Sequence, residues 1–392
     1  RRRMPGALYV AFQYSHRCSR RQGFPLPADH ITFDDRRQAA TRGRSGIARR
    51  WGRGQPWEAM PTTPRLPPAA LLMYPGLEAL VLSTGTRGRL GAVVDLATPV
   101  PFATPAEVPA EVEVLVTGWG CPVLDAQALA ALPVLRLVAH AAGTVRSLVS
   151  DALWDRGIVV TSAASANAVP VAEFTFAAII MITKDVFAVR DRHRDVRGCE
   201  AVVDQSRMGS RGRRIGLVGA STIGRLVIER LRSLDVEVVV ADPYLTTTEA
   251  TELGVALVDL DELLATSDVV SLHAPLLAST RHMIGADQLA AMRDGAWLLN
   301  TARGGLVDTD AITAELVSGR LNAFVDTPHP EPLPSGSPLY DLPNVVLTPH
   351  IAGAMGSEVS RMGDLAVTEV ERFVAGLPPL HPITRDAMDR IA

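Results

Sequence analysis

The stretch of residues 213–242 constrains the fold of this chain more than any other. Residues 215–218 and 236–241 are short apolar runs, which are typical of buried parallel strands. Between them, residues 219–224 form a tight turn of small side chains, and the apolar residues that follow recur at helical spacing. Asp242 ends the second strand. This order predicts a Rossmann-type dinucleotide-binding unit, which consists of a strand, a glycine turn, a helix, a second strand and an acidic residue.

The turn has the features that bind a dinucleotide, with one departure. A helix N-terminus offers unpaired N–H groups and a positive dipole end to a pyrophosphate. Asp242 can accept hydrogen bonds from ribose hydroxyls and repels a 2′-phosphate, so we expect NAD rather than NADP as the cofactor. Ser221 stands where the middle glycine is expected; serine resists positive φ, but it can donate its hydroxyl. A glycine turn alone is weak evidence, because an ordinary strand–helix loop can have the same composition.

Length and composition fit a globular protein of two or three domains. The 392 residues are 47% hydrophobic and 21% charged. The longest apolar run, residues 174–182, is bounded by Glu173 and Lys184 and is too short to span a membrane. The chain has three cysteines, Cys18, Cys121 and Cys199. They show no metal-ligand spacing, so we expect packing roles, no metal site and a reduced, cytoplasmic protein.

The first 60 residues differ in composition from the rest of the chain. They are rich in arginine and poor in acids and show no sustained periodicity, so we expect a basic, disordered extension. A nucleic-acid-binding arm and an organelle transit peptide are two functional interpretations. We favour a third, an upstream extension without a function, because the sequence from Met60 looks like a natural start. On that view there is no nucleic-acid partner.

From residue 69 onward, apolar runs alternate with helical patterns, which predicts an α/β protein with doubly wound sheets. The strands expected in a first layer are residues 70–74, 92–96, 112–117, 135–139 and 158–161, with helices at 124–132 and 151–156. The second layer is expected to add strands at residues 269–273, 296–300, 321–326 and 345–347, with helices at 261–266, 289–292 and 309–318.

Three further segments are expected to connect the two layers. Residues 167–184 predict a long apolar helix that crosses between them, with Pro170 in its first turn, where proline is tolerated. Residues 185–212 are charged and irregular and are expected to contain a second crossing. Residues 352–375 predict a last helix that returns to the first layer.

Three polar side chains follow predicted strands of the second layer, and together they suit the reduction of a ketone. The guanidinium of Arg303 can hold a carboxylate in bidentate fashion and polarise the carbonyl beside it. The imidazole of His350 can donate or accept the proton of the reacting oxygen. The carboxylate of Glu331 can fix the tautomer of that imidazole and favour its charged form. Each residue alone is more often structural, so the hypothesis depends on all three occurring in one α/β pattern.

With these residues the chain resembles the D-isomer-specific 2-hydroxyacid dehydrogenase family over roughly residues 110–380. The matching segments are residues 167–173, 219–224, 271–275, 300–308, 326–331 and 348–350. The resemblance implies NAD-dependent hydride transfer between a 2-keto acid and a D-2-hydroxy acid, with Arg303 binding the carboxylate and His350 and Glu331 as the acid–base pair. It also implies a homodimer of two-domain subunits. A flavodoxin-like substrate domain would comprise residues 61–183 and 349–392, and an NAD-binding Rossmann domain residues 184–348.

The resemblance also implies a set of cofactor and substrate contacts. The cofactor contacts would be Gly219, Ser221, Thr222, Ile223, Gly224, Asp242, His273, Pro275, Thr280, Thr301, Ala302, Arg303, Asp326, His350 and Gly353. Asp326 would hold the nicotinamide carboxamide, and His273 would lie beside the cofactor through its backbone. The substrate contacts would be Trp119, His140, Gly143 and Thr144, with backbone N–H groups near the last two meeting the substrate carboxylate.

The substrate loop departs from the family pattern, so the identity of the substrate does not transfer. His140-Ala141-Ala142 stands where the family has Arg-Ala-Gly. His140 is either a substrate contact or a packed loop residue, and Trp119 is either a lid over the pocket or a core residue. His329, two residues before Glu331, is expected on the loop surface.

Two alternative functions stay open at this point. Related enzymes oxidise formate or phosphite; formate dehydrogenases pair the histidine with glutamine, so Glu331 argues against formate but not against phosphite. A non-enzymatic alternative is an NAD-sensing protein like the C-terminal-binding corepressors, which keep the same catalytic residues.

Overall fold

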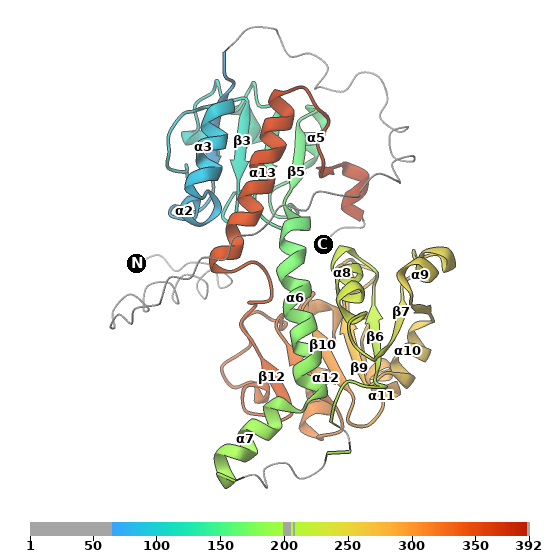
Figure 1. The fold of residues 1–392 in the computed structure, drawn as a ribbon. Helices are drawn as coiled ribbons and strands as arrows, with labels where there is room; N and C mark the ends of the chain where they lie inside the picture. The colour runs from blue at the N-terminus through green and yellow to red at the C-terminus, as the bar shows by residue number, and fades with distance from the viewer. Residues whose placement is uncertain (1–64, 199–204, 207, 390–392) are drawn as a thin grey trace, which may run out of the picture.

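A computed structural model of the chain describes residues 65–198, 205–206 and 208–389, and shows two stacked α/β units (Figure 1). The predicted basic extension, residues 1–60, lies outside the described residues, as do Cys18 and Cys199. Each unit contains one mainly parallel sheet with helices on both faces, so the predicted fold class is confirmed. The domain boundaries proposed above stay a prediction.

The first unit contains a six-stranded sheet in the order β13-β5-β4-β3-β1-β2. Its strands are β1 Pro68–Leu72, β2 Asp95–Leu96, β3 Val114–Thr117, β4 Leu137–His140, β5 Val159–Ser162 and β13 Pro382–Ile383. Only β13 is antiparallel, and the order of the other five is that of flavodoxin-like folds. The helices are α2 Glu78–Val81, α3 Thr84–Val93 and α13 Val359–Val374 on one face, with α4 Ala126–Ala130 and α5 Asp151–Asp155 on the other.

The predicted strand at residues 92–96 is mostly wrong. Helix α3 runs through Val93, and only Asp95–Leu96 form a short strand. Glycines at three positions of α3 lower its helix propensity, but its packing stabilises it. Ser83 caps the helix through Thr86 N–H, and Arg89 pairs with Glu371 of α13 at 2.6 Å.

The second unit contains a fully parallel seven-stranded sheet in the order β12-β11-β10-β9-β6-β7-β8. The strands are β6 Arg214–Val218, β7 Glu237–Ala241, β8 Ala256–Leu257, β9 Val269–Leu272, β10 Trp297–Asn300, β11 Asn322–Val325 and β12 Val345–Leu347. The helices are α8 Thr222–Leu231, α9 Thr247–Leu253, α10 Leu260–Thr266, α11 Ala286–Ala291 and α12 Thr309–Val317. The order reverses between β6 and β9, which is the Rossmann arrangement with one additional edge strand.

Helix α6, Ala164–Thr183, is the first connection between the units and packs in the core of the second one (Figure 1). It begins six residues before Pro170, so the placement of this proline in the first turn is wrong, and Pro170 lies buried inside the helix. By length and composition α6 could also span a membrane, but 56% of its apolar window is buried inside the protein. Packing of its apolar half in the core of the second unit therefore accounts for its apolar character.

The prediction that residues 185–212 contain the second connection between the units is wrong. The second connection follows β12. Helix α7, Val186–Val196, stays with the second unit, because Phe187 packs edge-on against Phe324 of β11 with ring centroids 5.9 Å apart. The chain instead returns through residues 348–358 to α13, which packs on the first sheet (Figure 1). The predicted return of the last helix is confirmed, although that helix begins at Val359 rather than at residue 352.

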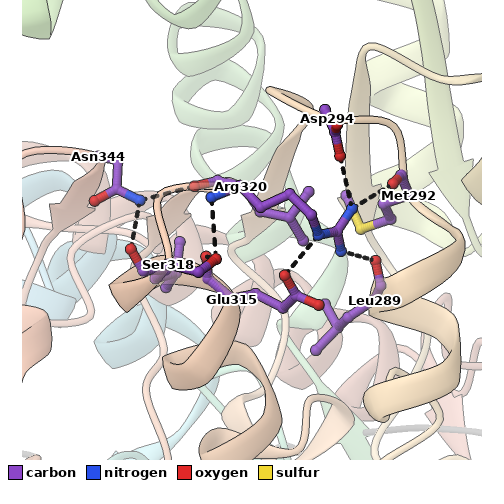
Figure 2. Close-up of polar contacts among 9 residues, drawn as sticks. Leu289, Met292, Asp294, Glu315, Ser318, Arg320 and Asn344 are labelled. Carbon is purple, nitrogen blue, oxygen red and sulfur yellow. Dashed lines mark hydrogen bonds and ion pairs between the residues drawn. The ribbon is translucent and has the colours of Figure 1, made fainter.

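One arginine ties two helices of the second unit together at the edge opposite the strand carboxyl ends (Figure 2). Its guanidinium donates to the carbonyl oxygens of Leu289 and Met292 at the end of α11, at 2.6 and 2.7 Å. It also pairs with Glu315 of α12 at 2.7 Å, while Asp294 lies further away at 3.4 Å. This residue, Arg320, is 25% exposed. It donates to the Met292 carbonyl just past the helix and is a second donor to the Leu289 carbonyl, which also accepts from Met292 N–H at 3.1 Å.

We expect Arg320→Ala to destabilise the protein by about 2 kcal/mol, because the Met292 carbonyl loses the Arg320 donor, the Leu289 carbonyl loses one of its two donors, and the ion pair with Glu315 is broken. Thermal unfolding of the variant and the wild type measures this loss. Asp294→Asn is the matched control: Asp294 is 87% exposed, so its variant should unfold within about one degree of the wild type. Equal unfolding temperatures for Arg320→Ala and the wild type would contradict the assignment.

Candidate functional site

A cleft of about 380 Å³ lies where the carboxyl ends of the two sheets face each other. Most of the predicted site residues line it, from both units. These residues are Gly143, Thr144, Ser221, Thr222, Ile223, His273, Pro275, Thr301, Ala302, Arg303, Asp326, His350 and Gly353. The topology therefore brings together segments as far apart in the sequence as Gly143 and Gly353.

The glycine turn lies at one wall of the cleft, and its geometry fits a dinucleotide. Gly219 has φ +102°, and a side chain there would lie 2.8 Å from the backbone N of Ala274. A side chain on Gly224 would lie 2.3 Å from the carbonyl oxygen of Gly219. These two glycines allow α8 to begin directly against the strand, so that its N-terminus faces the cleft. They shape the turn without lining the cleft themselves.

Asp242 closes the same turn from the end of β7. Its carboxylate accepts hydrogen bonds from the N–H groups of Ala220 at 2.6 Å and Tyr244 at 2.7 Å. The negative charge is thereby held beside the glycine turn, although Asp242 does not line the cleft. Thr280 is also outside the cleft lining; it bonds the backbone of its own loop at Pro275 and Leu277.

The structure brings Arg303, Glu331 and His350 together. Nδ1 of His350 lies 2.8 Å from Oε1 of Glu331, and the two side chains are 42% and 32% exposed. Burial lowers the pKa of Arg303, and the charge of the nearby Glu331 opposes that shift. Arg303 and His350 face the cleft, whereas Glu331 lines a second cavity of about 760 Å³ between α7 and β12. His329 is exposed, as expected for a loop residue.

The His350 segment is held in place by the buried carboxylate of Asp326. Oδ1 accepts from the Thr348 hydroxyl at 2.6 Å and from Ile351 N–H at 2.8 Å, and Oδ2 accepts from Ala352 N–H at 2.9 Å. His350 itself adopts φ +55°, which is uncommon for a residue with a side chain. Asp326 also lines the cleft, so one carboxylate both anchors the return segment and faces the ligand space.

Sequence reasoning did not assign a role to two residues of α6 that tie the cleft together. Asn167 accepts a hydrogen bond from Ala354 N–H at 2.8 Å and lines the cleft between Gly143 and Gly353. The hydroxyl of Thr175 lies 2.8 Å from that of Thr301. Asn167 falls in a segment that matches the family, which was the available signal; Thr175 looks like any buried helix residue.

His140 is a packed residue and does not line the cleft. It ends β4, is 4% exposed, and its Nδ1 lies 2.9 Å from the Thr117 hydroxyl. Burial lowers its pKa to about 4, while a hydrogen bond with the Thr144 backbone acts in the opposite direction. Of the two alternatives, the structure shows the packed residue: the imidazole supports the loop that carries Thr144, and a substrate contact of His140 stays a prediction. Trp119 packs against the core of the first unit and is also absent from the cleft lining.

His273 does line the cleft, but its imidazole is buried. Its Nε2 lies 2.9 Å from the Ser271 hydroxyl, and burial lowers its pKa to about 3. Among the described residues Nδ1 has no hydrogen-bond partner. The ring is therefore neutral at physiological pH. The Cβ of His273 would lie 3.4 Å from a side chain on Gly224.

Comparison with known proteins assigns the chain to a family. Residues 176–352 match the NAD binding domain of the D-isomer specific 2-hydroxyacid dehydrogenases. The chain is 35% identical to a glyoxylate reductase of Korarchaeum cryptofilum over 260 residues, which are 65% of this chain and 78% of that protein.

The chain belongs to the D-isomer specific 2-hydroxyacid dehydrogenase family.

Other members of this family place the similarity in context. A D-3-phosphoglycerate dehydrogenase of Mycobacterium tuberculosis is 32% identical over 254 residues, covering 64% of this chain and 48% of that protein. The chain thus spans about half the length of the curated phosphoglycerate dehydrogenases that it matches. The structure of apo D-mandelate dehydrogenase from Rhodotorula graminis superposes with a TM-score of 0.70 at 25% identity, covering 81% of this chain and 98% of that one. The second unit of this dehydrogenase lies within the residues that match the family model, so it is an NAD-binding domain.

We expect Asp326→Ala to release the His350 segment, because three hydrogen bonds to one buried carboxylate are lost. Hydrogen exchange followed by mass spectrometry should show faster exchange in a peptide covering residues 348–354. Thr348→Val removes only one of the three donors, so exchange there should rise less. Unchanged exchange in both variants would contradict the anchoring role.

Because His140 and His273 are buried and neutral, we expect acid to lower the free energy of unfolding of this dehydrogenase. The unfolded chain protonates His140 near pH 6.5, whereas the folded chain does so only near pH 4. The unfolded state therefore binds more protons between these values, and the free energy of unfolding decreases as pH falls through this window, by up to about 1.4 kcal/mol per pH unit. His140→Asn, which can keep the contact with Thr117, should lose less stability between pH 7 and 5 in thermal unfolding. Identical pH dependence of variant and wild type would argue against a neutral His140.

Proposed function

We propose that this protein is an NAD-dependent oxidoreductase that interconverts a 2-keto acid and a D-2-hydroxy acid. The observation that carries the proposal is the 2.8 Å contact between His350 and Glu331, within electrostatic reach of Arg303, at a cleft shared with the glycine turn. Arginine, carboxylate and imidazole meet where both sheets end, which is where α/β folds bind ligands. The similarity to a glyoxylate reductase supports the same chemistry.

The His350–Glu331 contact determines which imidazole nitrogen is available to the substrate. An ionised carboxylate only accepts hydrogen bonds, so Nδ1 of His350 carries the proton in this contact. Nε2 is then the atom that donates a proton to the carbonyl oxygen during reduction, or removes one from the hydroxyl during oxidation. Glu331 stabilises the imidazolium that forms in the second case. Bound NAD supplies the hydride transfer itself.

Arg303 is placed to hold the carboxylate of the substrate. It lines the cleft, and its Nη1 donates to its own neighbour, the Ala302 carbonyl, at 2.8 Å. Among the described residues the guanidinium of Arg303 has no other hydrogen-bond partner, so the rest of the fork can bind a planar carboxylate, and partial burial strengthens that interaction. Backbone N–H groups at Gly143 and Thr144, on the opposite wall, are proposed to meet the same carboxylate.

Asp242 favours NAD over NADP in this proposal. Its carboxylate is fixed beside the glycine turn by two backbone N–H groups, so it cannot easily move away from a 2′-phosphate. Following the family resemblance, we also propose a cytoplasmic homodimer without membrane or nucleic-acid partners. Light scattering of the purified chain would distinguish a dimer from a monomer.

A panel of 2-keto acids tests the reaction. Glyoxylate, hydroxypyruvate, pyruvate and phenylpyruvate are each supplied with NADH or NADPH, and consumption of the reduced cofactor is followed by absorbance. We expect turnover of at least one acid, with NADH preferred. NADH binding without turnover of any acid would count against the reaction and favour the NAD-sensing alternative, and oxidation of phosphite with NAD would identify the phosphite-type alternative.

Within that assay, Arg303→Ala should lower kcat/KM by about 100- to 1,000-fold, because a partly buried cation that stabilises developing charge is lost. Arg303→Lys should restore little, since an ammonium lacks the bidentate fork. Arg361→Ala, which removes an exposed arginine on α13, is the control and should retain wild-type kcat/KM. A fully active Arg303→Ala variant would remove the carboxylate-binding role.

A further inference from the structure

Ser221 combines two properties that the dinucleotide fingerprint does not anticipate. It is the N-cap of α8, where its Oγ accepts a hydrogen bond from Gly224 N–H at 3.4 Å. It also lines the cleft, next to Thr222 and Ile223 at the start of the helix. The serine therefore stabilises the helix end and faces the ligand space.

The fold itself makes no demand for glycine at this position. Ser221 has φ −60° and ψ 178°, an extended conformation that any residue adopts. By contrast, Gly219 requires positive φ, and a side chain on Gly224 would overlap the Gly219 carbonyl. A glycine in the middle of such a turn lets a pyrophosphate approach the backbone closely. In this chain that space contains the hydroxymethyl group of Ser221.

The hydrogen-bonding capacity of the hydroxyl indicates what it does there. A hydroxyl has one proton to donate and two lone pairs. One lone pair accepts from Gly224 N–H, and among the described residues no acceptor for the Ser221 proton is found. The contact with Gly224 occupies one of the N–H groups that the helix N-terminus would otherwise offer to an anion, while the hydroxyl proton is free to replace it.

We propose that the Ser221 hydroxyl donates a hydrogen bond to the diphosphate of the bound dinucleotide, in place of the Gly224 N–H that it occupies. The inference rests on the proposed function, because it takes NAD as the ligand of the cleft. On this proposal the side chain of Ser221 contributes to cofactor affinity. In the usual fingerprint, the residue at this position is a glycine, which can contact the diphosphate only through its backbone. A methyl group at this position keeps the diphosphate at a distance and offers no donor.

Direct binding of NADH and of ADP-ribose to the full-length variants tests the inference. ADP-ribose keeps the diphosphate but lacks the nicotinamide, so both ligands should respond alike. Calorimetric titration should show about tenfold or more weaker binding of each ligand by Ser221→Ala, as expected when a hydrogen bond to a charged group is lost. Ser221→Thr keeps a hydroxyl and should bind both ligands within about threefold of the wild type.

Ser83→Ala is the matched control, because Ser83 caps α3 of the first unit by accepting from Thr86 N–H at 3.1 Å. Both alanine variants lose a helix cap, but only Ser221→Ala should lose ligand affinity. The inference is overturned if Ser221→Ala binds both ligands within twofold of the wild type, or if Ser221→Thr binds as weakly as Ser221→Ala. It is also overturned if only NADH binding weakens, or if Ser83→Ala weakens binding equally.

The experiment separates this inference from the proposed function. A wild-type protein that binds neither NADH nor ADP-ribose would refute the cofactor assignment and the role of Ser221 together. A wild-type protein that binds both ligands while Ser221→Ala binds them equally well would refute the role of Ser221 alone.

Discussion

The buried carboxylate of Asp326 is the interaction on which the site depends. Leaving a buried carboxylate without partners costs several kcal/mol, so the three donors from residues 348–352 must stay in place. These donors flank His350 on both sides in the sequence. The left-handed backbone of His350 costs of order 1 kcal/mol or more, which the surrounding hydrogen bonds offset. The imidazole is thus directed at Glu331 by a charge at the end of the neighbouring strand.

A second set of hydrogen bonds ties the connections between the units to the site. The chain passes between them through α6 and through residues 348–358 (Figure 1). Residues of both segments line the cleft. Asn167 of α6 accepts from Ala354 of the return segment, and Thr175 bonds Thr301 at the end of β10. The connections are therefore part of the site, and any change in the relative placement of the units would move Gly143 and Thr144 with respect to His350 and the glycine turn.

Much of the fold was predictable because parallel strands and the glycine turn leave local patterns in the sequence. Apolar runs and Asp242 predicted the strands and helix around the glycine turn. Apolar runs also predicted the later strands along the chain. Helix α3 was missed because its stability comes from Ser83, Arg89 and α13, and not from its own glycine-rich sequence. The second crossing was misplaced because charge and irregularity in residues 185–212 do not reveal that Phe187 packs on the second sheet.

The site was predictable in part, for a related reason. Arg303, Glu331 and His350 follow separate strands, and parallel strands end at one edge, so their meeting followed from topology and motif order. The direction of the His140 side chain could not be predicted. A strand buried on both faces shows no alternation of polar and apolar residues that would distinguish a side chain facing the core from one facing the cleft.

In the glycine turn, some positions of the sequence motif are constrained by the fold and others by the bound ligand. Gly219 and Gly224 are required by the fold, since a side chain at either would overlap backbone atoms whether or not a ligand is bound. Ser221 has ordinary dihedral angles, so its backbone does not require glycine, and the side chain is constrained by the helix cap and by the ligand. A departure from a motif at a position of the first kind would argue against the fold. A departure at a position of the second kind leaves the fold intact and reports on how the ligand is held, which is why the serine of this chain is compatible with a dinucleotide site.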